Sequence, residues 1–193
     1  PSVFVSPEHR SLRLGAPLTI RFHARGDETD AIAIVPAGAT ADAAHLSQVP
    51  RETWVDGVVT FGTTNLTPGA WDAILTTGTG EILARAPFWL LGTDDLPTLK
   101  APATPIEIGT AFEVAFQHAP GNRWDWIALI PQGEPDPQNY IGYWYTDARI
   151  DGSVTIDTAP LVEWLAAGRH RLLLMQDDGY VELAETAIDL TAR

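Results

Sequence analysis

A seven-residue phrase occurs twice in this chain. The letters DAIAIVP at residues 30–36 return as DWIALIP at residues 125–131, 95 positions later. The dipeptide DG repeats at the same offset, at positions 56 and 151, and further matches follow in the same order. Chance similarity does not keep its register through a whole unit, so we infer an internal duplication.

The sequence pattern of each copy predicts a series of short β-strands. Leu18, Ile20 and Phe22 alternate with polar residues, and so do Phe112 and Val114, which is the period of two that a half-buried strand requires. Short apolar runs follow, separated by turn signals rich in Gly, Pro and Asp. About seven strands in about 95 residues is typical of an antiparallel β-sandwich. The sequence therefore predicts an all-β protein made of two tandem sandwiches, residues 1–94 and 95–193. Only the stretch PLVEWLAAG, residues 160–168, is predicted to be helical.

Charge and composition exclude several function classes. The chain has 12 Lys and Arg against 25 Asp and Glu, a formal net charge of −13. Such a surface disfavours nucleic acid and anionic membranes, because both are bound through cationic side chains. Cysteine is absent, which excludes disulfides, thiolate zinc sites and cysteine nucleophiles. No apolar run approaches the ~20 residues of a membrane span, so membrane insertion is not expected.

The sequence contains no catalytic signature. Nucleophile-elbow, zinc-protease and phosphate-loop motifs are missing, and the five histidines show no metal-ligand spacing. His170 is expected to be a core residue. Acidic runs at residues 27–30, 94–95 and 177–178 offer calcium ligands, but we favour solvated turns. Asp30 and Asp125 open the repeated phrase, which indicates one structural role such as holding a loop amide. We predict no catalytic residue, no metal site and no cofactor.

Several phrases of the second copy occur together in a known kind of module. DWIALIP, YIGYWYT at residues 140–146 and DDGYVELAE at residues 177–185 resemble an immunoglobulin- or fibronectin-III-like module of bacterial extracytoplasmic proteins. Such modules accompany metallophosphoesterase-like or von Willebrand A-type domains. The family usually has a tyrosine after its Pro-Gly or Gly strand start, where this chain has Trp71 and His170.

The resemblance implies an Ig/FnIII-like fold and an extracytoplasmic location, periplasmic, secreted or at the cell surface. The implied function is a non-catalytic accessory module that spaces or docks a partner domain of the same or a neighbouring polypeptide. Two other functions stay open. One is carbohydrate or surface-polymer binding through exposed aromatics, and the other is a structural subunit of a surface filament that pairs through its edge strands. An enzyme ranks last.

Strand alternation predicts an aromatic patch on the second copy. Ile127 and Leu129 match core positions of the first copy, so Trp126 faces outward. If Trp144 points inward, its two tyrosine neighbours point outward as well. The predicted binding patch consists of Trp126, Tyr143, Tyr145, Tyr180, Asp177 and Asp178. The first copy, with LSQVPRETW at residues 46–54, lacks it. The alternative is that the first domain or the loop at residues 131–139 covers this patch.

Overall fold

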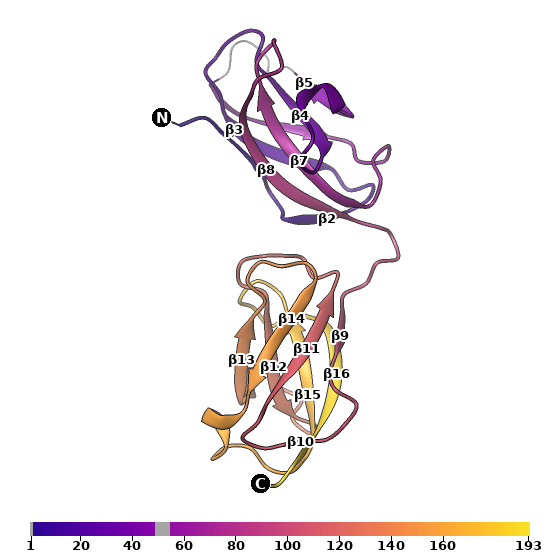
Figure 1. The fold of residues 1–193 in the computed structure, drawn as a ribbon, viewed down its shortest axis with the longest axis vertical. Coiled ribbons are helices and arrows are strands. Elements are labelled where there is room, and N and C mark those ends of the chain that lie inside the picture. Colours follow the sequence, from indigo (N-terminus) through magenta and orange to yellow (C-terminus); the bar gives the residue numbers. More distant parts are fainter. Residues whose placement is uncertain (1, 49–54) are drawn as a thin grey trace. The chain divides into compact units, whose positions relative to one another are not determined.

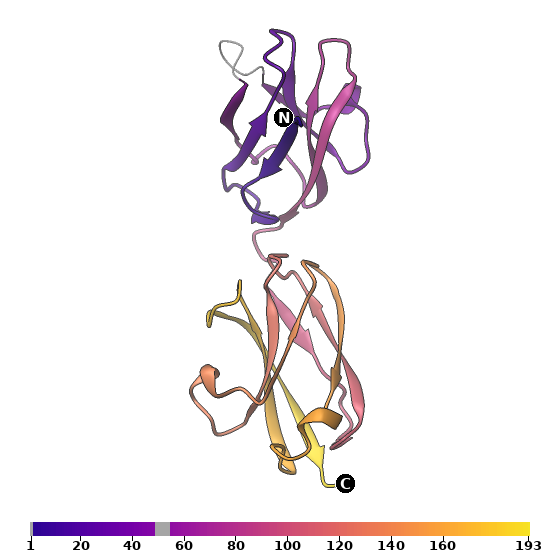
Figure 2. The ribbon, with the colours of Figure 1, turned by 90° about the vertical axis from the view of Figure 1, so that its left-hand side faces the viewer.

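The computed structural model describes residues 2–48 and 55–193, and the chain divides into two compact units, Pro1–Asp94 and Asp95–Arg193. Within the described residues there are sixteen β-strands and three short 3-10 helices, and α-helix is absent (Figure 1). Each unit has two layers of sheet, which separate clearly in the view of Figure 2. The all-β prediction of two tandem sandwiches is confirmed.

The first domain pairs its strands in two sheets. They are β1 (Phe4–Pro7), β2 (Ser11–Arg13), β3 (Leu18–His23), β4 (Ala31–Pro36), β5 (Leu46–Gln48), β6 (Asp56–Phe61), β7 (Gly69–Thr76) and β8 (Ile82–Leu91). One sheet has the order β1-β3-β6 and the other β2-β8-β7-β4-β5. The pairing is antiparallel except between β2 and β8. Three strands facing a larger sheet in this order form an immunoglobulin-type sandwich.

The second domain repeats this topology strand for strand. Its strands are β9 (Thr98–Lys100), β10 (Ile106–Glu107), β11 (Ala111–Gln117), β12 (Trp126–Pro131), β13 (Gly142–Tyr145), β14 (Gly152–Asp157), β15 (Gly168–Met175) and β16 (Glu182–Thr191). The sheets run β14-β11-β9 and β10-β16-β15-β12-β13, again with one parallel pair, β10 with β16. The two halves of the sequence therefore fold alike, as a duplication requires.

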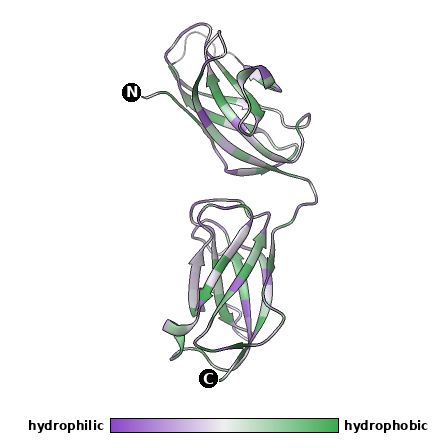
Figure 3. Cartoon of the chain, in the orientation of Figure 1, coloured by the Kyte–Doolittle hydropathy of each residue, from purple (hydrophilic) through white to green (hydrophobic). Residues whose placement is uncertain are grey.

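The core of each domain lies between its two sheets. In β11 the residues Phe112, Val114 and Phe116 are buried while their neighbours are exposed, the alternation expected of a strand with one wet face. Figure 3 shows the same mixture of hydrophobic and hydrophilic segments along the strands of both domains. Strands β4 and β12 differ, because they are buried on both faces. Something must therefore cover their outer sides.

A buried threonine closes the same turn in both domains. The hydroxyl of Thr63 accepts a hydrogen bond from the Gly15 amide at 2.9 Å and donates to the Ala16 carbonyl at 2.7 Å. Thr158 does the same with Gly109 and Thr110, at the same distances. The backbone groups of a tight loop would otherwise be buried without partners. Thr63 and Thr158 are therefore a further matching pair of the repeat, with the same structural role in both domains.

The structure decides three features singled out in the sequence: the segment 160–168, Trp71 and His170. The segment 160–168 is not a full helix: only Ala159–Leu161 forms a 3-10 helix (η4), followed by a single turn closed by Leu165 N–H donating to Leu161 O at 3.1 Å. Leu161 and Leu165 pack this turn against the core. In the first domain Trp71 stands where the related modules usually have a tyrosine, and its indole N–H donates to the Thr67 carbonyl at 2.8 Å, as the hydroxyl of a tyrosine corner would. His170 is buried, as expected.

Candidate functional site

The outer face of the five-stranded sheet of the second domain carries the predicted aromatic residues. Trp126 pairs directly with Tyr145, and Ala128 with Tyr143. Directly opposed residues of an antiparallel pair lie on the same face. Trp144 packs on the opposite side, against the core between the sheets. The alternation predicted from the sequence is therefore confirmed.

Two loops extend this face beyond the strands. The loop carrying the short helix η3 (Pro137–Asn139) ends at Tyr140, and the hairpin between β15 and β16 carries Tyr180. Both loops project from the same side of the domain in Figure 2. Trp124, just before β12, lies edge-on to Tyr145, with ring centroids 5.3 Å apart. The chain has four tyrosines, and all of them gather here. We call this surface the aromatic face; it consists of Trp124, Trp126, Tyr140, Tyr143, Tyr145, Tyr180 and Asp178.

Trp126 lies buried beneath the other rings of this face. It is only 4% exposed and packs with Ala128, Ile130, Leu173 and Met175 in a small second core on the outer side of the sheet. Its indole N–H donates to the Gly179 carbonyl at 3.1 Å. The outward direction was predicted correctly, but the prediction of an exposed indole was wrong, because the hairpin and Tyr140 cover it.

Three tyrosine rings contact Trp126 edge to face. The rings of Tyr140, Tyr143 and Tyr180 make angles of 70°, 87° and 84° with the indole plane, at centroid distances of 5.2, 6.4 and 5.9 Å. These edge-to-face contacts match the preferred geometry of aromatic pairs. Tyr143 and Tyr180 stay 53% and 46% exposed. Between the rings is a pocket of about 150 Å³.

The two aspartates of the hairpin have different roles. Asp178 lines the pocket, and its Oδ1 accepts a hydrogen bond from the Tyr145 hydroxyl at 3.0 Å. This bond is the main cause that raises the pKa of Tyr145 above its ordinary value. Asp177 contributes its backbone amide to Asp125 instead of lining the pocket. Both residues have positive φ, 48° and 57°, which shapes the turn.

Asp125 fixes the loops beneath the aromatic face. Its fully buried carboxylate accepts hydrogen bonds from the Asn122 amide at 2.9 Å, the Asn122 side chain at 3.1 Å and the Asp177 amide at 3.0 Å. Burial raises the pKa of the Asp125 carboxyl. The predicted role of holding a loop amide is confirmed here. Asp30 occupies the same place in the first domain but pairs with the Arg25 guanidinium at 2.8 Å.

The matching face of the first domain carries small, aliphatic and charged side chains where the structure describes it. Ser47 lies opposite Ala33 as Tyr143 lies opposite Ala128. Ala33, Val35 and Ile74 form the small outer core there. The rest of the compared stretch, residues 49–54, lies outside the described residues. Asp72 and Arg85 form an ion pair on this face.

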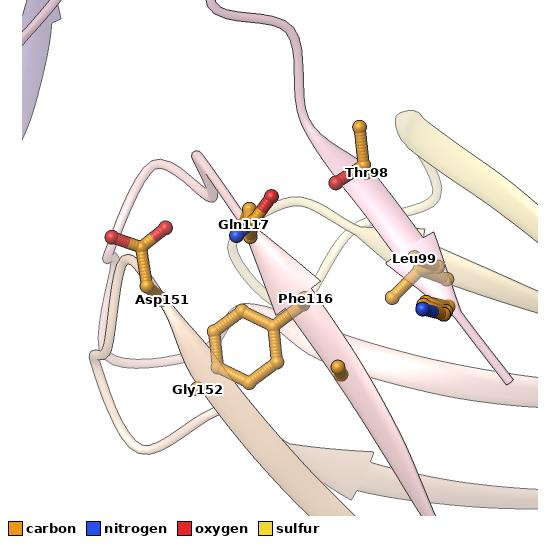
Figure 4. Close-up of a pocket in the computed structure, with 8 residues that line it drawn as sticks. Thr98, Leu99, Phe116, Gln117, Asp151 and Gly152 are labelled. Atoms are coloured by element: carbon orange, nitrogen blue, oxygen red, sulfur yellow. The ribbon is translucent and has the colours of Figure 1, made fainter.

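A different depression occurs in both domains and is a property of the fold. In the second domain it lies over the three-stranded sheet, at Thr98, Gln117, Asp151 and neighbouring residues (Figure 4). The first domain has its counterpart at Arg21, Asp56 and nearby positions, and each measures about 540 Å³. Three lining residues match between the copies, Phe22 with Phe116, Asp56 with Asp151 and Gly57 with Gly152, and the other lining residues differ. We therefore attribute them to the sheet and not to a ligand.

The acidic runs do not assemble a metal centre in the described ranges, where no three side chains of His, Asp or Glu converge. Asp27 forms a turn, its Oδ1 accepting from the Thr29 amide at 2.9 Å, as the turn interpretation predicts. His23 contacts Asp56 at 2.6 Å, and the His118 amide donates to the matching Asp151 at 2.9 Å. The described part of the chain contains no helix that is long and apolar enough to cross a bilayer.

Comparisons with known proteins give distant structural similarity only. No family model matches the sequence, and no curated protein is a significant match. The polymeric Ig receptor ectodomain of a teleost fish shares 13% identity, with 98% of this chain and 97% of that chain covered and a TM-score of 0.34. Tandem Ig domains of titin share 13%, covering 100% and 97%, with a TM-score of 0.36. A third similar structure is the Bacteroides ovatus protein SGBP-B in complex with a mixed-linkage heptasaccharide. The match covers 95% of this chain and 44% of that chain, with 11% identity and a TM-score of 0.32.

Proposed function

We propose that this chain is a non-catalytic binding module whose second domain contacts a partner through the aromatic face, while the first domain serves as a spacer. The observation that carries the proposal is the one-sided distribution of aromatics over a duplicated fold. All four tyrosines and two tryptophans gather on one sheet face of one copy, and the matching face of the other copy carries small, aliphatic and charged side chains where the structure describes it. The first domain has the same strand topology without these rings, so the topology does not require them.

The surroundings of the aromatic face favour a macromolecular partner. Next to it, along the free edge of β13, runs a groove of about 310 Å³ that shares Tyr140 and Tyr143 and continues over Trp144 and Leu161. Trp164 lies exposed on the turn that follows η4, at 66%. Exposed apolar patches of this kind mark contact sites, and Tyr, Trp and Arg dominate the binding energy of protein interfaces.

The partner that we propose is a protein domain of the same or a neighbouring polypeptide in an extracytoplasmic compartment. The acidic net charge of −13 argues against nucleic acid. The family resemblance of the second copy supports the compartment and the accessory role.

Site-specific photo-crosslinking tests the proposal with a matched control. A benzoylphenylalanine is placed at Tyr143 in one variant of the full chain and at Ser47 in another, because both residues are exposed and lie opposite an alanine of the adjacent strand. In extracts of the source organism we expect a discrete adduct from position 143 and none from position 47.

Competition decides whether that adduct is specific. Excess unlabelled chain should suppress it, and excess Tyr180→Ser chain should not, because Tyr180 is an exposed wall of the face. Equal adducts from both positions, or none from position 143, would contradict the proposal.

A glycan is the second candidate partner. It is favoured by the exposed rings of Tyr143 and Tyr180, which suit stacking on sugars, and by the carboxylate of Asp178 as an acceptor for hydroxyls. A glycan array separates the two candidates. Retention of one glycan class by the chain, lost in Tyr143→Ser, favours the sugar, whereas an empty array together with the crosslink favours the protein.

A further inference from the structure

The pocket in the aromatic face is small and walled by rings. It measures about 150 Å³ and is lined by Trp126, Tyr140, Tyr143, Tyr145, Asp178 and Tyr180. Sites for drug-sized ligands measure roughly 300–1,000 Å³. The pocket therefore admits one compact group of a larger ligand, and its chemistry selects which group.

The electrostatics of the pocket favour a cation. The faces of aromatic rings carry negative potential and attract cations within about 6 Å of the ring centroid. Asp178 is the one ionised side chain among the six lining residues. The same surface already contains such a contact at its margin, where the Arg123 guanidinium lies 4.7 Å from the Trp124 ring. The Asp178 carboxylate would repel an anionic group.

Asp178 is held in position for this role. Its backbone amide donates to the Trp124 carbonyl at 2.8 Å, and the preceding amide is tied to Asp125. The Tyr145 hydroxyl binds one carboxylate oxygen at 3.0 Å. A carboxylate with its backbone and one oxygen fixed loses little freedom when a cation approaches, which favours binding.

We propose that this pocket binds a quaternary ammonium group, as carried by choline or by Nε-trimethylated lysine; the inference rests on the proposed binding function of the aromatic face. A primary ammonium is strongly hydrated and has three N–H donors to satisfy. A trimethylammonium group has no donors and presents methyl groups to the rings while its charge lies near Asp178. Five of the six residues that line the pocket carry aromatic rings, which can contact these methyl groups.

Titration with choline tests the assignment directly. Choline added to the full chain should bind saturably, and ring currents should shift its N-methyl proton signal upfield in the NMR spectrum. The neutral isostere 3,3-dimethylbutan-1-ol should bind at least tenfold more weakly, because it has the shape without the charge. Nε-trimethyllysine should compete and lysine should not. If trimethyllysine binds tighter than choline, the source is a modified protein; the reverse order indicates a choline-bearing molecule.

Variants of exposed residues provide the controls. Tyr143→Ser and Asp178→Asn should each weaken choline binding about tenfold or more, and Tyr143→Phe should restore it. Asp177→Asn is the matched control: it removes the neighbouring carboxylate, which does not line the pocket, and should leave affinity within about twofold. Each variant is checked for an unchanged melting temperature.

Three results would overturn the assignment: no shift with choline or trimethyllysine, equal affinity for the isostere, or equal loss in both aspartate variants. If the crosslink from position 143 persists while choline fails to bind, the ligand class is wrong and the binding face stands. If neither is observed, the proposed function fails too.

Discussion

Replacing Trp126 by alanine is expected to lower the free energy of unfolding of the second domain by about 3–5 kcal/mol, the usual range for a buried aromatic side chain. The indole is 4% exposed, packs under the hairpin and donates to the Gly179 carbonyl. Its loss leaves a cavity and removes the floor against which Tyr140 and Tyr180 rest.

Differential scanning calorimetry of the full chain measures this effect. The transition of the second domain should fall by roughly 12 °C or more, since 1 kcal/mol corresponds to about 4–8 °C in a domain of this size. Tyr143→Ala serves as the comparison, because the exposed ring should cost less than about 1 kcal/mol. A Trp126→Ala variant that melts within a few degrees of the parent would show that the packing of the indole contributes little to the stability of the domain.

Replacing Asp125 by alanine should destabilise the second domain by about 2–4 kcal/mol at neutral pH, because buried amide donors lose their acceptor. The carboxylate is fully buried and ties Asn122 and Asp177 to the start of β12. The equivalent Asp30→Ala should cost less, because its partner Arg25 is 45% exposed and water replaces the lost contact. Urea unfolding of both variants gives the order, and a larger loss from Asp30→Ala would contradict it.

The pH dependence of the Asp125 effect has a definite sign. Burial raises the pKa of this carboxyl above the ordinary value of 3.8. The folded state therefore favours the protonated acid, so its contribution is fully present below the ordinary pKa and declines as the pH rises through the raised value. Asp125→Asn has no such titration. Relative to the parent, it should gain stability as the pH is raised from about 3.8 through the folded pKa, and urea unfolding at several pH values measures that trend.

Periodicity made the sheets predictable, and it placed Tyr143 and Tyr145 on the outer face. It could not predict that Trp126 is buried, because the cover comes from the hairpin and the η3 loop. The path of the hairpin depends on left-handed backbone at Asp177 and Asp178 and on hydrogen bonds to residues distant in the sequence. The local sequence pattern of a strand does not indicate which distant loops will pack on it.

The candidate site was predicted in part. Five of its residues, Trp126, Tyr143, Tyr145, Asp178 and Tyr180, follow from alternation and from the DDGY turn. Tyr140 was missed because it precedes the strand and lies outside its alternation, and Trp124 because it falls in a loop before Asp125. A useful signal was present in the composition: every tyrosine of the chain lies between residues 140 and 180. Asp177 was assigned to the patch, whereas its amide, not its side chain, serves the site.

The hydrogen bond from the Asp177 amide to Asp125 couples the buried start of β12 to the outer surface of the second domain. The same acid opens the same strand in both copies, yet in one it meets an arginine and in the other the hairpin that carries Asp178 and Tyr180. A substitution at Asp125 is therefore expected to change the geometry of the aromatic face together with the stability of the domain.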